Sequence, residues 1–142
     1  MVWTSGSFLR LCMKAILPAL TAVLSVLSSS ALAAHPFLCC DYGGDKVCIV
    51  SAEGVIQWQY DCRHPQDCWK LPNGNILFCF VSGALEVTPD AAKKVVWEYK
   101  APDKVEVHAC QPLPEGKVMI VECGTSRIIE VGRDGKIAKE IK

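Results

Sequence analysis

Short apolar runs separated by turn residues fill the chain from residue 37 onward, and none has the 3.6-residue period of an amphipathic helix. Two runs, Asn75–Val81 and Val118–Val121, are apolar at nearly every position, which predicts strands buried on both faces. Alternating runs predict outer strands with one wet face at Val55–Tyr60, Val95–Tyr99 and Lys136–Ile141. Further strands are predicted at Val47–Ser51, Ala84–Thr88 and Arg127–Val131. The pattern predicts an all-β protein.

The dipeptide Asn73-Gly74 is a strong hairpin signal, because both residue types accept a positive φ. A two-residue turn there joins strand Asp67–Leu71 to the buried run that follows, and it places Cys68 opposite Cys79. Directly opposed residues have Cβ atoms about 4.5–5.5 Å apart. We therefore predict contact between Cys68 and Cys79, with a disulfide between them left open.

The pattern repeats about every 40 residues. LPNGN at 71–75 recurs as LPEGK at 113–117, and WQY at 58–60 recurs as WEY at 97–99. The segment 38–50 also matches 119–131 without a gap. Repeats of this length with four short strands each are typical of β-propeller blades, since a single blade cannot cover its own two apolar faces.

We therefore expect a partial β-propeller of about two and a half four-stranded antiparallel blades in residues 35–142. An ordinary β-sandwich is the alternative, but the sandwich architecture does not explain why the same sequence unit occurs more than once. Propellers close with roughly four to eight blades. We therefore expect either missing blades in a longer protein or self-association through an exposed blade.

Residues 1–34 predict a signal-peptide helix. Arg10 and Lys14 precede an apolar segment at 15–27, and Ala31-Leu32-Ala33 has the small-residue pattern of a cleavage site. Met13 is an alternative start. The remaining chain is predicted to be exported, to the periplasm or the cell exterior, and to have no membrane segment after the signal is removed.

Charge excludes two classes of partner. The whole chain has a formal charge of zero, and it shows no run of basic residues. Nucleic acids and anionic membrane surfaces are therefore not expected partners.

The cysteine count is high, with nine in the chain and eight after residue 34. An even number in an exported protein permits disulfides, although the sequence does not give the pairing. Cys48, Cys79 and Cys110 lie inside apolar runs, so they are equally explained as small buried hydrophobic residues. There is no Cys-x-x-Cys and no His pair at ligand spacing, so no metal site is predicted.

The repeat resembles those of PQQ-like (quinoprotein alcohol dehydrogenase-like) β-propellers and of the related arylsulfotransferase-like propellers. The resemblance lies in the pattern from His108 to Lys117, in Ile129-Glu130-Val131, in Gly135-Lys136 and in Val95–Tyr99. It departs from the family at Gln66, where the family pattern has His. The resemblance raises PQQ as a cofactor and the adjacent Cys39-Cys40 as a contact for it, although neighbours in a regular strand point to opposite faces.

Inner strands of a propeller line its central channel. The channel-facing candidates for ligand binding are His64, Gln66, Asp67, Glu106 and His108. A histidine at position 108 could bind an anion, act as a general acid or base, or hydrogen-bond the backbone of a neighbouring blade. Trp58 and Trp97 recur at one point of successive blades, which favours inter-blade packing over a ligand platform.

No complete set of catalytic residues is present in the sequence. We therefore expect an exported propeller repeat protein, or the N-terminal part of one, that serves as a scaffold for a small-molecule or protein ligand. The alternative is the N-terminal part of a propeller enzyme, either PQQ-dependent dehydrogenase-like or arylsulfotransferase-like. Fold alone does not choose between them.

Overall fold

The computed structural model describes residues 35–142, so the predicted signal peptide and the alternative start lie outside the described residues. Eleven strands and one 3-10 turn follow each other along this part of the chain. They are β1 (Phe37–Asp41), β2 (Lys46–Val50), β3 (Ile56–Asp61), β4 (Pro65–Lys70), β5 (Ile76–Phe80), β6 (Gly83–Val87), β7 (Val95–Lys100), β8 (Glu106–Pro112), η1 (Pro114–Gly116), β9 (Val118–Cys123), β10 (Arg127–Val131) and β11 (Ile137–Ile141).

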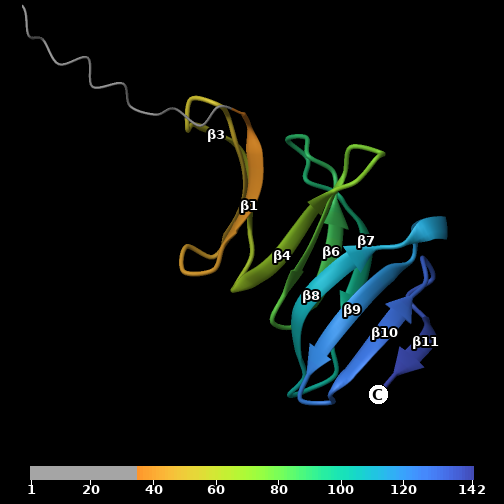
Figure 1. The fold of residues 1–142 in the computed structure, drawn as a ribbon. Helices are drawn as coiled ribbons and strands as arrows, with labels where there is room; N and C mark the ends of the chain where they lie inside the picture. Colours follow the sequence, from red (N-terminus) through yellow and green to blue (C-terminus); the bar gives the residue numbers. More distant parts are fainter. Residues whose placement is uncertain (1–34) are drawn as a thin grey trace, which may run out of the picture. The chain divides into compact units, whose positions relative to one another are not determined.

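The strands form three antiparallel sheets in chain order, orange to yellow, green, and blue in Figure 1. The first sheet is β1-β2-β3, the second is β4-β5-β6-β7 and the third is β8-β9-β10-β11. Each of the two four-stranded sheets runs from an inner strand to an outer strand without a crossover, as a propeller blade does. The expected partial β-propeller is confirmed, with two full blades and a three-stranded one.

The first sheet has no strand beside the free edge of β1 among residues 35–142. By the repeat, β1 corresponds to β5 and β9, the second strands of the other sheets. The first sheet therefore has the second, third and outer strands of a blade, and the described residues supply no inner strand for it.

The hydrophobic core lies between the sheets in two clusters. Between the first and second sheets, Val47 packs with Ile76 and Phe78. Between the second and third sheets, Leu77 packs with Ile120. Strand β5 contributes alternate residues to both clusters, so the prediction that it is buried on both faces is confirmed. Each sheet is thus stabilised by the apolar face of the next.

The hairpin register between β4 and β5 differs from the predicted one by a residue. Cys68 lies opposite Phe78, and Cys79 lies opposite Asp67. The loop has three residues, because the backbone N–H of Leu71 donates to the carbonyl of Asn75 at 2.8 Å. In that loop Gly74 has a φ of +88° while Asn73 does not have a positive φ. This is a turn closed by a left-handed glycine rather than a two-residue turn.

The corrected register moves Cys68 and Cys79 to opposite faces of the hairpin. Cys68 packs in the core between the first and second sheets, and Cys79 packs in the core between the second and third. The direct contact predicted for these two cysteines was therefore wrong, because one extra loop residue reverses which face each side chain takes.

Candidate functional site

Both inner strands carry an irregularity at the same point of the repeat. In β4 the register shifts between Pro65 and Asp67, and in β8 it shifts between Val107 and Ala109. Gln66 and His108 occupy these two bulges. A β-bulge turns the side chain of the extra residue out of the regular alternation and is often found beside binding sites. Gln66 and His108 therefore occupy the same kind of backbone irregularity, a β-bulge, in their two strands.

His108 and Glu106 form an exposed pair on β8. The Nε2 atom of His108 lies 3.2 Å from the Oε2 atom of Glu106, and their side chains are 47% and 57% exposed. Neither group is tied to another strand by a hydrogen bond in this part of the chain. Their polar atoms therefore remain accessible to a ligand.

Asp67 joins the two inner strands instead of facing a ligand. One carboxylate oxygen, Oδ1, accepts the backbone N–H of Cys68 at 2.8 Å, and the other accepts the backbone N–H of Cys110 at 3.3 Å. Beside it, the indole N–H of Trp69 donates to the carbonyl oxygen of Cys110 at 2.6 Å. The acceptor capacity of Asp67 is largely used in fixing β8 against β4.

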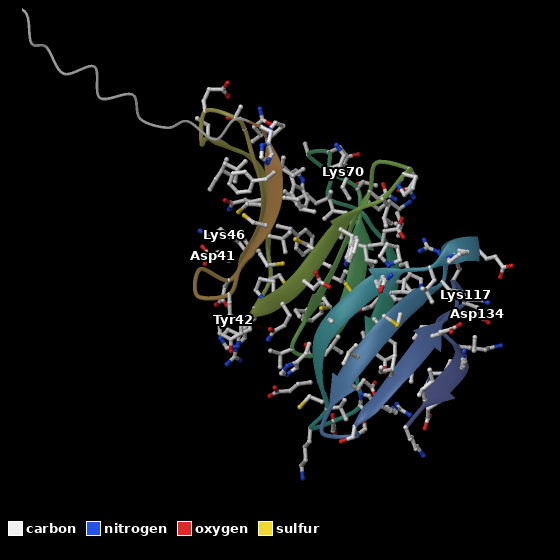
Figure 2. All side chains as sticks on the ribbon, viewed as in Figure 1. Asp41, Tyr42, Lys46, Lys70, Lys117 and Asp134 are labelled. Atoms are coloured by element: carbon white, nitrogen blue, oxygen red, sulfur yellow. The ribbon has the colours of Figure 1, made fainter. Side chains whose placement is uncertain are left out.

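His64 lies away from the other candidates, in the turn between β3 and β4. Its φ is 49°, and its backbone N–H donates to the Oδ1 atom of Asp45 at 2.9 Å. Its ring stacks on Tyr42, labelled in Figure 2 at the end of β1, with 4.5 Å between centroids. These contacts join two neighbouring turns, so the structure groups His64 with the β1–β2 turn and not with His108.

A second polar cluster, which the sequence did not suggest, centres on Glu86. This carboxylate is 1% exposed, and its Oε1 atom accepts hydrogen bonds from the side-chain amides of Asn73 and Asn75 at 3.1 and 2.6 Å. Its Oε2 atom accepts a hydrogen bond from Arg133 of the third sheet at 2.5 Å. The asparagines of the LPNGN motif therefore hold a buried charge as well as forming the turn.

These hydrogen bonds decide the charge of Glu86. Burial raises the pKa of its carboxyl, but the hydrogen bonds from Arg133, Asn75 and Asn73 outweigh burial and hold the pKa below its ordinary value. The available sequence signal was an acid between two apolar residues of a strand, Leu85 and Val87.

A cavity of about 380 Å³ opens beside this cluster between the second and third sheets. Leu71, Pro112 and Val118 contribute apolar walls, and Glu86 and Arg133 contribute the polar ones. Figure 2 labels Lys117, which also lines the cavity, and Asp134 at the same end of the third sheet. The carboxylate of Glu86 is satisfied here by Arg133 and the two asparagines, whereas Arg133 has further N–H donors beyond the one that binds Glu86.

Glu122 is the second buried acid that links strands. It is 2% exposed and accepts hydrogen bonds from the hydroxyl of Tyr99, from Thr125 at 3.0 Å and from Arg127 at 2.5 Å. Arg127 also reaches Glu140 of β11 at 2.9 Å. This network fastens the outer strand of the third sheet and the outer strand of the second, so we assign it to stability.

Trp58 and Trp97 each lie on the outer strand of one sheet, toward the next sheet. The indole N–H of Trp97 donates to the carbonyl of Gly132 at 3.0 Å, and the Arg133 guanidinium lies 5.9 Å from its ring centroid. Trp58 lines a hollow with Pro89, but its indole nitrogen is buried without a hydrogen-bond partner. The two equivalent positions thus share packing and differ in hydrogen bonding.

Within residues 35–142, no group of three or more His, Cys, Asp or Glu side chains is placed to hold a metal ion. In the same range, no helix is long and apolar enough to cross a bilayer. Cys39 lies opposite Cys48 and Cys40 lies opposite Val47 in the regular strand β1, so the adjacent pair faces opposite ways. That arrangement does not fit the cysteine contact to PQQ that the family resemblance raised.

No protein-family model and no curated protein matches the sequence. Solved structures match the fold. A protein of unknown function from Bacteroides caccae has a TM-score of 0.63 and 26% identity, over 72% of this chain and 39% of its own. Virginiamycin B lyase from Staphylococcus aureus has a TM-score of 0.60 and 15% identity, over 75% of this chain and 37% of its own.

A streptogramin B lyase structure matches with a TM-score of 0.59 and 19% identity, over 74% of this chain and 36% of its own. The chain therefore spans well under half the length of the solved structures it resembles. At these identities the likeness to the lyases carries the fold and no activity. Residues 35–142 therefore make up consecutive sheets of a β-propeller-type fold.

Proposed function

We propose that this protein is an exported β-propeller repeat protein, of the PQQ-like repeat type, that acts as a scaffold for a polar small-molecule or protein ligand. The observation that carries the proposal is the exposed Glu106–His108 pair at the bulge of inner strand β8. This pair offers one carboxylate and one imidazole within 3.2 Å of each other, and neither holds the fold together.

The contrast with the other inner-strand residues supports this assignment. Asp67 and Trp69 are used to connect β4 with β8, and His64 is used in the turn with Asp45. Gln66 sits at the bulge equivalent to that of His108 and is partly exposed. Gln66, Glu106 and His108 are therefore the residues that we expect a ligand to contact.

The repeat type, the export and the partners of the first sheet are parts of the same proposal. The PQQ-like assignment is supported by the LPEGK turn and by the outer-strand Trp97 that bonds the loop of the following sheet. Export is supported by the signal-like residues 1–34. The open edge of β1 supports pairing with further propeller strands or with a second copy.

The test is an NMR titration of the ¹⁵N-labelled protein with amino acids, monosaccharides and short-chain carboxylates. A ligand of the proposed site shifts the amide signals of Gln66, Glu106 and His108. His108→Ala should weaken the binding of that ligand by up to about tenfold, since one hydrogen bond to a polar group contributes about 1.4 kcal/mol or less.

The matched control replaces Glu98 and Lys100, an exposed pair two residues apart on outer strand β7, with alanine. This variant should bind as the parent does. Ligands that shift only outer-strand amides, or that bind His108→Ala equally well, contradict the proposal. Retention of added PQQ through dialysis, read from its absorbance, would favour the propeller-enzyme alternative instead.

A further inference from the structure

Four of the cysteines form two pairs, and each pair lies between adjacent sheets. Cys40 on β1 faces Cys68 on β4, and both pack in the core between the first and second sheets. Cys79 on β5 faces Cys110 on β8, and both are buried in the core between the second and third sheets. All four are thiols in this structure.

Within each pair the two cysteines lie on strands that pack directly against each other, β1 against β4 and β5 against β8. The interaction with Cys68 raises the pKa of Cys40, and the interaction with Cys79 raises the pKa of Cys110. The second pair is also held by its backbone, because the N–H of Cys110 donates to Asp67 and its carbonyl accepts from Trp69. These bonds fix β8 against β4, at Asp67, which lies directly opposite Cys79 in the β4–β5 register.

The two pairs are equivalent under the repeat. Cys40 and Cys79 stand at the same position of the second strand in successive sheets, and Cys68 and Cys110 stand at the same position of the inner strand. A buried cysteine that served only as a small hydrophobic residue would need no partner of its own kind. A cysteine therefore lies next to another cysteine at each of two successive interfaces. This recurrence indicates that the cysteines are paired.

We propose that Cys40 with Cys68, and Cys79 with Cys110, are disulfide-forming pairs that link each sheet covalently to the next in an oxidising environment. The oxidant is a small-molecule or protein disulfide. One cysteine thiolate attacks the oxidant and releases one of its two thiols, and the partner cysteine then attacks the mixed disulfide and releases the second. Two electrons and two protons pass from each cysteine pair to the two thiols released.

In the first pair, the interaction between the two thiols lowers the pKa of Cys68 and, with burial, raises the pKa of Cys40. The thiolate is the nucleophile in disulfide exchange, so one sulfur of the pair attacks the oxidant and its partner resolves the mixed disulfide.

The experiment is peptide mapping after oxidation of the purified full chain with glutathione disulfide. Remaining thiols are alkylated in denaturant, and the protein is cut with trypsin. Cleavage after Lys and Arg leaves Cys68 in 64–70, Cys79 in 71–93 and Cys110 in 105–117, each as the single cysteine of its peptide. We expect 71–93 linked to 105–117, and 64–70 linked to the peptide that contains Cys40.

Two controls sharpen the result. Cys39 shares a peptide with Cys40 and is the cross-strand partner of Cys48, so Cys39→Ser tests whether the link to Cys68 persists, as it should. Cys123 is exposed and belongs to neither pair, so it should be recovered alkylated or as a mixed disulfide with glutathione, and not linked to any of the four paired cysteines.

Other linkages overturn the proposal. A Cys68–Cys79 link, or links that join Cys79 to anything except Cys110, contradict the inter-sheet pairing. Full alkylation of all four cysteines after oxidation contradicts it too, provided that the same treatment oxidises the protein when it is unfolded. The mapping does not depend on ligand binding, so a failure of the proposed ligand site leaves this result unaffected.

Discussion

At the scale of single residues, the two equivalent tryptophans show how one position of the repeat has diverged. Trp97 has a hydrogen-bond acceptor in the next sheet, the carbonyl of Gly132, while the indole nitrogen of Trp58 is buried without one. A buried donor without a partner destabilises the folded state, whereas a satisfied one stabilises it modestly.

Trp97→Phe should therefore lower the free energy of unfolding by about 1–2 kcal/mol, because it removes the indole hydrogen bond and some buried ring area, while the Gly132 carbonyl keeps the N–H of Gly135. Trp58→Phe removes an unsatisfied donor along with some ring area. We therefore expect a smaller decrease in the free energy of unfolding for this variant than for Trp97→Phe, with a difference of about 1 kcal/mol between the two. Urea unfolding of the two variants measures the difference. A larger loss for Trp58→Phe would show that ring area, and not the hydrogen bond, decides these positions.

Glu86 makes stability depend on pH. Its pKa is lowered in the folded state, so its contribution is fully present above the unfolded pKa of about 4.3 and is lost as pH falls through the folded pKa. Glu86→Gln should cost about 2 kcal/mol near neutral pH, because it leaves Arg133 and two amides without the carboxylate. The difference from the parent should shrink as the pH is lowered through that window.

Glu130 offers the matched control, since it stands at the equivalent position of β10 and forms a half-exposed pair with Lys139 at 3.6 Å. Glu130→Gln should change stability by less than about 0.5 kcal/mol. Unfolding midpoints measured between about pH 3 and pH 7 test both variants. Parallel pH curves for the parent and Glu86→Gln would refute the assignment.

At the scale of strands and hairpins, the repeat is carried by periodicity and by turns. Val95–Tyr99 was predicted to alternate, and in β7 Trp97 and Tyr99 are buried while Val96 and Glu98 are exposed. Val95 departs from the prediction, because it is exposed at the start of the strand, where the register with β6 shifts. The two turns that correspond in the repeat, LPNGN and LPEGK, differ in conformation. In LPEGK the turn becomes a 3-10 segment in which Glu115 has a φ of 61° as well as Gly116, unlike the single left-handed glycine of LPNGN.

Gly83 controls the spacing of two strands. A Cβ atom added there would lie 2.1 Å from the backbone carbonyl oxygen of Tyr99, which cannot move without separating β6 from β7. Gly83→Ala should destabilise the protein by about 2 kcal/mol or more. At Gly43 an added Cβ meets nothing within 4 Å, so Gly43→Ala is the control and should be nearly neutral. Equal thermal midpoints for the two variants would contradict this account.

At the scale of the whole molecule, the three sheets depend on one another for burial. The second sheet is covered on both faces, by the first sheet on one side and by the third on the other. The sheets interact through side chains, with few backbone hydrogen bonds between them. Covalent links at the two interfaces would therefore add to side-chain packing and, between the second and third sheets, to side-chain hydrogen bonds such as that of Arg133 with Glu86.

Formation of the two proposed disulfides should raise the free energy of unfolding. Each closes a loop of about 30 residues, for which restriction of the unfolded chain gives about 3–4 kcal/mol. We expect the oxidised protein to lose that stability on treatment with dithiothreitol, measured as a lower urea midpoint. Cys79→Ala with Cys110→Ala should lose about half of the effect of oxidation. A midpoint that does not respond to reduction would contradict a stabilising role.

The sequence by itself determined the strands, the length of the repeat and the propeller-type fold, because these follow from local periodicity and turn chemistry. Contacts between residues far apart in the chain were decided only by the tertiary structure. The pairing of Cys79 with Cys110, and of Glu86 with Arg133, depends on how two sheets stack and on a hairpin register set by one loop residue. Side-chain direction reverses with each such residue, so local pattern could locate the cysteines but could not choose their partners.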